Sequence, residues 1–343
     1  MGKATIALIG HKDMRMHPVE EVKPENQTII IHFILLGFAF HGKMQLLFFT
    51  AVSIVFLATM IGNSLIAVIT TIDPALHTPM YYFLKNLALV EICYSLSIVP
   101  KMLVTLLMER KVTSFTACAL QLAVLYFLSL EKCFLLGAMA YDRQVAICHP
   151  LHYSTMMNRN VCVKMAIGSW LSGVPMAVGF TTWLFTLSFC GTNKFDHFFC
   201  DVSPVLKLVC ANTTLFELLI FIALVVIVMI PFSLIFISYL CIIHAVLQIP
   251  SGVGQKQAFS ACAAHLMVVT FFYSTVGIIH LQPKSRLSTT MKKMVSPTYT
   301  VVTPMLNPII YSLRNQEVKQ SLRRCFDRRL RMKLLAGLFF LMA

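Results

Sequence analysis

The stretch MQLLFFTAVSIVFLATMIGNSLIAVITTI, from Met44 to Ile72, contains no Asp, Glu, Lys or Arg. A helix rises about 1.5 Å per residue, so about 20 residues cross a hydrocarbon core about 30 Å thick, and this stretch is longer than that. Hydrocarbon offers the backbone no hydrogen-bond partner, whereas a helix satisfies its own N–H and C=O groups. The stretch therefore predicts a helix that crosses a membrane.

Further apolar runs follow along the chain. Those that also lack Asp, Glu, Lys and Arg are Met165–Asn193, Leu218–Gln255, Gln257–Pro283 and Met294–Leu313. Two more, Asn86–Pro100 and Val112–Tyr141, are interrupted only by Glu91 and by the pair Glu131–Lys132. Runs of this length are too long for the strands of a membrane barrel. The pattern predicts an all-α membrane protein, a bundle of seven transmembrane helices.

The runs divide the chain into three regions: an N-terminal segment (1–43), the seven-helix domain (44–313) and a tail (314–343). The tail begins with apolar side chains near one helical face and basic ones opposite, which is typical of a short amphipathic helix on a membrane surface. Its basic residues are Arg314, Lys319, Arg323, Arg324, Arg328, Arg329, Arg331 and Lys333. This cluster predicts a cytoplasmic tail facing anionic lipid and, with seven crossings, an extracellular N-terminus.

The net charge of +14 would also suit nucleic-acid binding. However, the chain is 58% hydrophobic and only 12% charged, about half the charged fraction of a soluble domain. Basic residues in so apolar a chain flank membrane spans, so the lipid bilayer rather than nucleic acid is the predicted partner. Glycosylation sequons at Asn26 and Asn212 both fall on the predicted outer side.

No arrangement of side chains in the sequence suggests catalysis: there is no plausible nucleophile–base pair or phosphate-binding glycine loop. We therefore expect neither an enzyme nor a cofactor. His197, Cys200 and Asp201 could bind a metal, but a disulfide-bonded Cys200 would supply no thiolate, so no metal is expected. A transporter is disfavoured because no inverted repeat is visible.

Four of the eleven cysteines, Cys118, Cys190, Cys200 and Cys210, fall on the predicted outer side, where oxidising conditions favour disulfides. Their number suggests two bridges, and spacing alone leaves three pairings open.

An acid and a base, Asp142 and Arg143, stand together in MAYDRQVAICHPLHY (139–153). The long Arg143 stem at the inner end of the third run lets the guanidinium reach the polar interface. Three other long motifs are LHTPMYYFLKNLALVEICYSLSIVPKML (76–103), AFSACAAHL (258–266) and PMLNPIIYSLRN (304–315). In this order, the four motifs resemble those of the vertebrate olfactory receptors of class II (tetrapod type), which belong to the rhodopsin-like G-protein-coupled receptors. The resemblance runs from about Asn26 to Arg324.

The resemblance implies a switch at the inner ends of the helices. Its residues are Asp142, Arg143, Tyr239, His265, Asn307, Pro308 and Tyr311. Arg143 is expected to be neutralised by Asp142 at rest and to swing towards Tyr239 and the G protein on activation. Pro308 weakens its helix, so the segment below it can rotate. Gln144 replaces the usual tyrosine of the family, a departure that puts the strength of coupling in doubt.

Glu91 occupies the family's acidic site in the second helix, where other rhodopsin-like receptors bind sodium. The family usually has an acid where Lys132 stands. We predict that Lys132 pairs with Glu91 and takes the place of the sodium ion, which would stabilise the resting state. Glu131 is the competing partner, although neighbouring side chains on a helix point in different directions.

Helical spacing places two stripes of side chains on the third and sixth helices, and the resemblance makes them ligand-facing together with residues of the fifth and seventh. The predicted pocket comprises Leu125, Tyr126, Ser129, Leu130, Ala223, Ile227, Tyr273, Val276, Gly277, His280 and Thr300. A mostly apolar surface with a few hydrogen-bonding groups suits a small, volatile, largely apolar molecule.

By the same resemblance, Cys118 joins Cys200 and Cys190 joins Cys210. The resemblance further implies an odorant receptor of the plasma membrane that activates a heterotrimeric G protein of the olfactory Gs type and thereby raises cyclic AMP. A receptor for a peptide or a lipid is the alternative, and the apolar character of the predicted pocket favours odorants.

Overall fold

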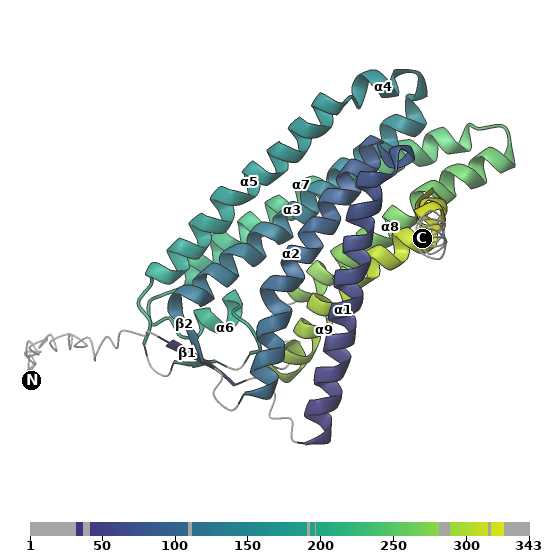
Figure 1. Ribbon diagram of the computed structural model, residues 1–343. Helices are drawn as coiled ribbons and strands as arrows, with labels where there is room; N and C mark the ends of the chain where they lie inside the picture. Colours follow the sequence, from purple (N-terminus) through teal and green to yellow (C-terminus); the bar gives the residue numbers. More distant parts are fainter. Residues whose placement is uncertain are drawn as a thin grey trace, which may run out of the picture.

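The computed structural model describes residues 32–36, 42–108, 112–190, 193–195, 197–280, 289–314 and 317–325. Within these residues, the long helices form one bundle. They are α1 (Lys43–Ile72), α2 (Pro79–Leu107), α3 (Phe115–Cys148), α5 (Arg159–Thr186), α7 (Thr214–Leu247), α8 (Gly252–His280) and α9 (Thr289–Arg314). Figure 1 shows α3 in the interior of the bundle, where it packs against α2, α5, α7 and α8, whereas α1 packs against α2 and α9.

Within the described residues, α1, α2, α3, α5 and α7 are long and apolar enough to cross a membrane. The bent pair Gly252–Ser260 and Cys262–Gly277, which makes up most of α8, gives a sixth candidate. Large apolar side chains on α7, such as Phe221, Ile230 and Leu240, are exposed on the outside of the bundle. This is the arrangement expected of a helix whose outer face lies in lipid rather than in water.

Local chemistry explains where several helices begin and how closely they pack. Ser114 begins α3 by accepting a hydrogen bond from the N–H of Ala117 at 3.2 Å. Gly62 on α1 faces Pro308 on α9, and an added Cβ at Gly62 would lie only 2.8 Å from the Pro308 ring. The missing side chain therefore lets α1 and α9 approach closely.

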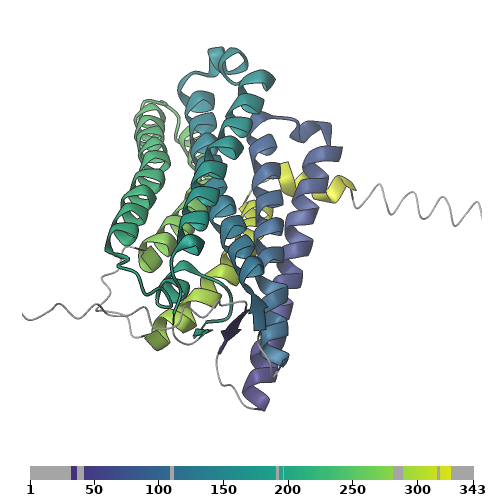
Figure 2. The same cartoon turned by 90° about the vertical axis from the view of Figure 1, so that its left-hand side faces the viewer.

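A small sheet and a short helix, α6 (Val202–Leu206), lie at one end of the bundle. The sheet has the order β2–β1–β3, in which β1 (His32–Leu35) pairs antiparallel with β2 (Val112–Ser114) and parallel with β3 (Lys194–Phe195). Figure 2 shows this sheet at the end opposite the turn that joins α3 to α5, which contains α4 (Tyr153–Met156). The sheet therefore marks one membrane side and α4 the other.

Residues 317–325 form a further helix after α9, which Figure 2 shows lying across the bundle axis. Val318 and Ser321 are buried on one face, whereas Lys319, Arg323 and Arg324 are exposed on the other. The predicted short amphipathic helix after the seventh span is thus confirmed.

The loop after α1 holds this helix in place. The Asp73 carboxylate accepts hydrogen bonds from the Ser321 hydroxyl and from Arg324 Nη2, the latter at 2.9 Å. The hydrogen bond from Ser321 lowers the pKa of Asp73, aided by the Ala75 N–H and the Arg324 charge and opposed by burial. The ionised carboxylate is therefore the form that binds the helix.

Candidate functional site

A buried ion pair lies in the interior of the bundle. Lys132 Nζ on α3 lies 2.7 Å from Glu91 Oε2 on α2, and the two side chains are only 5% and 1% exposed. Asn307 Nδ2 on α9 donates to the other oxygen, Glu91 Oε1, at 2.7 Å. The ammonium also lies 3.6 Å from the centre of the Tyr94 ring, a cation–π contact. The carboxylate therefore joins three helices, α2, α3 and α9.

Glu131, the competing partner considered for Lys132, binds elsewhere. Its Oε1 accepts a hydrogen bond from the Ser169 hydroxyl on α5 at 2.7 Å. Consecutive residues on a helix are about 100° apart around its axis, so Lys132 points to α2 while Glu131 points to α5. The alternative Glu131–Lys132 pair is therefore wrong.

Several of the predicted switch residues lie near the end of the bundle opposite the small sheet. Tyr239 Oη on α7 lies 2.7 Å from His265 Nδ1 on α8, and both residues are buried. In the part of the chain that the structure describes, Arg143 Nε and the Tyr311 hydroxyl are buried without hydrogen-bond partners.

Asp142 is buried beside Arg143, but among the described residues the two form no direct ion pair. The Asp142 carboxylate instead accepts a hydrogen bond from the Tyr153 hydroxyl at 2.9 Å. Tyr153 begins the short helix α4 in the loop that follows α3. Asp142 thus ties this loop to α3, and the expected ion pair with Arg143 is replaced by this hydrogen bond.

Two disulfides lie at the sheet-bearing end. Cys118 at the start of α3 is bonded to Cys200, and Cys190 to Cys210, with Cα atoms 5.5 Å and 5.7 Å apart. Beside the first bridge, Gln121 Oε1 accepts from the N–H of Cys200 at 3.2 Å and Gln121 Nε2 donates to the Ser97 carbonyl at 2.7 Å. The long loop before α7 is therefore held against α2 and α3 by covalent and polar contacts together.

The predicted pocket residues belong to α3, α7, α8 and α9. Thr300 and Leu130 are buried, while Leu125, Tyr126, Ser129, Ala223, Ile227, Tyr273, Val276 and Gly277 are partly buried. The hydroxyls of Tyr273 and Thr300 are buried and have no hydrogen-bond partner in the described part of the chain. Such groups cost free energy unless another molecule satisfies them. The side chain of His280 and the sequon residue Asn26 lie outside the described residues.

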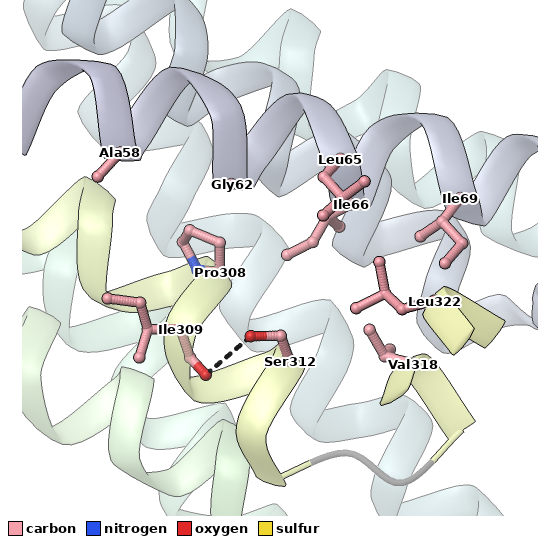
Figure 3. A pocket seen from close by; sticks show the side chains of 10 residues that line it. All are labelled: Ala58, Gly62, Leu65, Ile66, Ile69, Pro308, Ile309, Ser312, Val318 and Leu322. Carbon is pink, nitrogen blue, oxygen red and sulfur yellow. Dashed lines mark hydrogen bonds between the residues drawn. The ribbon is translucent and has the colours of Figure 1, made fainter. Parts of the chain in front are cut away.

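A small cavity of about 100 Å³ lies away from these residues, between α1, α9 and the helix 317–325 (Figure 3). Its lining is almost entirely apolar: Ala58, Gly62, Leu65, Ile66, Ile69, Pro308, Ile309, Ser312, Val318 and Leu322. The Ser312 hydroxyl already donates to the Ile309 carbonyl of its own helix at 3.2 Å. The cavity offers no free polar group to orient a ligand.

Residues 52–329 match the family model described as olfactory receptor. The chain belongs to the olfactory receptor family. It is 50% identical to human olfactory receptor 10A7 over 90% of this chain and 98% of that protein, and 51% identical to human olfactory receptor 10A5 over 88% and 96%. The crystal structure of squid rhodopsin shares the fold, with a TM-score of 0.67 and 18% identity over 84% of this chain and 83% of that one.

Membership in the olfactory receptor family confirms the resemblance drawn from the motifs and the seven-helix fold. The chain is a multi-pass membrane protein of a receptor family rather than an enzyme. The positions and roles of individual ligand-binding and switch residues stay predictions.

Several polar contacts of this olfactory receptor were not predicted from the sequence. Asn63 on α1 donates to the carbonyls of Thr59 and Pro304, at 2.9 and 3.1 Å, and so ties α1 to α9. Ser238 on α7 donates to Gln144 on α3. The signal for Asn63 was present in its sequence context, because an amide near the middle of the long apolar run Met44–Ile72 needs a partner inside the membrane.

Proposed function

We propose that this olfactory receptor binds small, volatile, largely apolar odorants between α3, α7, α8 and α9, and then activates a G protein of the Gs type. The proposal rests mainly on the Tyr273 and Thr300 hydroxyls, which are buried in mostly apolar surroundings without a partner among the described residues. A ligand with one hydrogen-bonding group could satisfy either hydroxyl while its apolar body gains about 25 cal/mol per Å² of buried surface.

Features at the two ends of the bundle support a proposed orientation in the membrane. The disulfide-bonded loop and the exposed sequon residue Asn212 belong to the end that carries β1. The basic helix 317–325 lies beyond the other end, after α9. We propose that the first end is extracellular, that the second faces the cytoplasm, and that the receptor acts in the plasma membrane.

Activation is proposed to begin when the ligand changes how α8 packs against α3 and α7. The hydrogen bond between Tyr239 and His265 would break as the inner half of α8 moves outward. Tyr239 would then approach Arg143, whose buried Nε lacks a partner among the described residues. The opened inner face would bind the G protein, and cyclic AMP would rise.

The ion pair of Glu91 and Lys132 is proposed to stabilise the resting state. The Lys132 ammonium lies where a bound sodium ion would otherwise neutralise the carboxylate, at 2.7 Å from Glu91 Oε2. The hydrogen bond from Asn307 links this pair to α9, directly before Pro308. A rearrangement of α9 would therefore have to break or rotate a contact to a buried charge.

A cyclic-AMP reporter in transfected cells tests the function. Cells expressing the receptor are exposed to a panel of volatile aldehydes, alcohols, acids and esters, and receptor at the surface is measured in parallel. We expect a response to at least one compound, which Arg143→Ala abolishes without removing the receptor from the surface. For that compound, Tyr273→Phe or Thr300→Val should weaken the response, whereas Thr270→Val, at an exposed position on α8, should not. A response that survives Arg143→Ala would contradict the proposal.

A further inference from the structure

A hydrogen bond joins α3 and α7 beside the switch. Ser238 on α7 is fully buried, and its hydroxyl donates to Gln144 Oε1 on α3 at 2.9 Å. Gln144 follows Arg143 in the chain, and Ser238 precedes Tyr239. The bond therefore lies directly beside the two residues that are proposed to meet on activation.

The position of this bond matches the packing of the two helices. Both α3 and α7 start at the disulfide-bearing end, so they run in the same direction. Gly137 on α3 faces Pro231 on α7, where an added Cβ would lie 3.5 Å from the proline Cβ. Gln144 follows Gly137 by seven residues, and Ser238 follows Pro231 by the same seven. Parallel helices that repeat a contact every seven residues keep the same faces together.

The register set in this way determines where Tyr239 lies. Tyr239 is buried against α8, with its hydroxyl 2.7 Å from His265 Nδ1 and the two rings stacked at 5.9 Å between centroids. A rotation or shift of the inner end of α7 would move Ser238 and Tyr239 together. The hydrogen bond to Gln144 opposes such a movement, because breaking it would leave the buried Ser238 hydroxyl unsatisfied.

We propose that Gln144 is a positioning residue, which holds the inner end of α7 in the resting register and so keeps Tyr239 on His265 and away from Arg143. The proposal rests on the proposed receptor function. Removing a buried hydrogen bond of this kind shifts a conformational equilibrium by about 2- to 10-fold. The olfactory receptor should therefore be more active without ligand when either partner is removed.

The first test measures basal cyclic AMP per receptor at the cell surface. Gln144→Leu removes the acceptor and Ser238→Ala the donor, and each should raise the basal signal by about 2- to 10-fold. The double variant should be no more active than the more active single one, because both remove the same bond. Ser233→Ala, at an exposed position on the same helix, is the matched control and should leave the signal unchanged.

The second test is independent of the G protein. Amide hydrogen exchange of purified receptor should be faster at the inner end of α7 in Ser238→Ala than in the wild type or in Ser233→Ala. Unchanged exchange there, or single variants whose basal signals are unchanged or lower, would overturn the positioning role. If the wild type gives no cyclic-AMP signal with any odorant, the proposed function fails, and the exchange experiment still decides whether Gln144 holds α7.

Discussion

Replacing Lys132 with glutamine removes the ammonium that lies 2.7 Å from Glu91 Oε2 and leaves a carboxylate that is only 1% exposed. Asn307 still donates to Glu91 Oε1. One neutral hydrogen bond does not replace a full countercharge in a medium of low dielectric constant. The variant must therefore protonate Glu91, admit a cation from solution, or lose stability.

The size of the effect follows from the burial of both partners. Removing one partner of a buried ion pair costs about 3–5 kcal/mol, because the other charge is left uncompensated. In Glu91→Gln with Lys132→Gln, no charge is left uncompensated in the interior, and the two amides can hydrogen-bond to each other and to Asn307, so the loss should be smaller than in Lys132→Gln alone. We therefore expect Lys132→Gln to unfold at a lower temperature than both the wild type and the double variant.

The first assay is thermal unfolding of the purified receptor in detergent, measured once in sodium chloride and once in choline chloride. The second is basal cyclic AMP in cells, expressed per receptor at the surface. The wild type should unfold at the same temperature in both salts, because Lys132 already neutralises Glu91. Lys132→Gln should be stabilised by sodium relative to choline, and its basal signal in the cell should differ from that of the wild type. If it unfolds like the wild type in both salts and its basal signal is unchanged, the ion pair does not stabilise the resting state.

Two further predictions concern the contacts of α1 and the loop that follows it. Gly62→Ala should destabilise the receptor by about 1–3 kcal/mol in thermal unfolding, because the new Cβ would lie 2.8 Å from the Pro308 ring, whereas Gly168→Ala, with no atom within 4 Å, should not. The folded pKa of Asp73 is lowered below its ordinary value of 3.8, so its contribution is present above that value and is lost as the pH falls through the folded pKa. Amide hydrogen exchange of residues 317–325, measured relative to that of α3, should therefore rise below about pH 4. Ser321→Ala should show this faster exchange already at neutral pH. If the helix is as protected in Ser321→Ala as in the wild type, the prediction is wrong.

The long helices were predictable from the sequence because their signal is local. Lipid requires about 20 apolar residues for each crossing, and the run Met44–Ile72 differs from α1 by a single residue at its start. The small sheet was not predictable, because β1 pairs with strands far away in the sequence and has only four residues. A strand this short carries almost no periodic pattern of its own.

Whether a polar contact could be predicted from the sequence depended on whether its residues are charged. Lys132 and Glu91 stand out in apolar runs, since a charge in hydrocarbon needs a partner, and the family resemblance then singled out Glu91 rather than Glu131 as the partner of Lys132. Ser238 and Gln144 are neutral, and serine hydroxyls in membrane helices often bond to their own backbone, as Ser172 does to the Ser169 carbonyl. Only the register of α3 against α7 shows that Ser238 meets Gln144 instead.

The polar residues of α3 point to different neighbours along its length. Gln121 contacts α2 and the disulfide-bonded loop, Glu131 contacts α5, Lys132 contacts α2, and Gln144 contacts α7. Each contact is short and mostly buried, so α3 cannot turn or slide without breaking several of them. A ligand shifts an equilibrium only by the difference in its affinity for the two states. If the proposed function holds, an odorant that binds between α3 and α8 would therefore act mainly by moving α8, while α3 stays in place as the element against which Tyr239 moves.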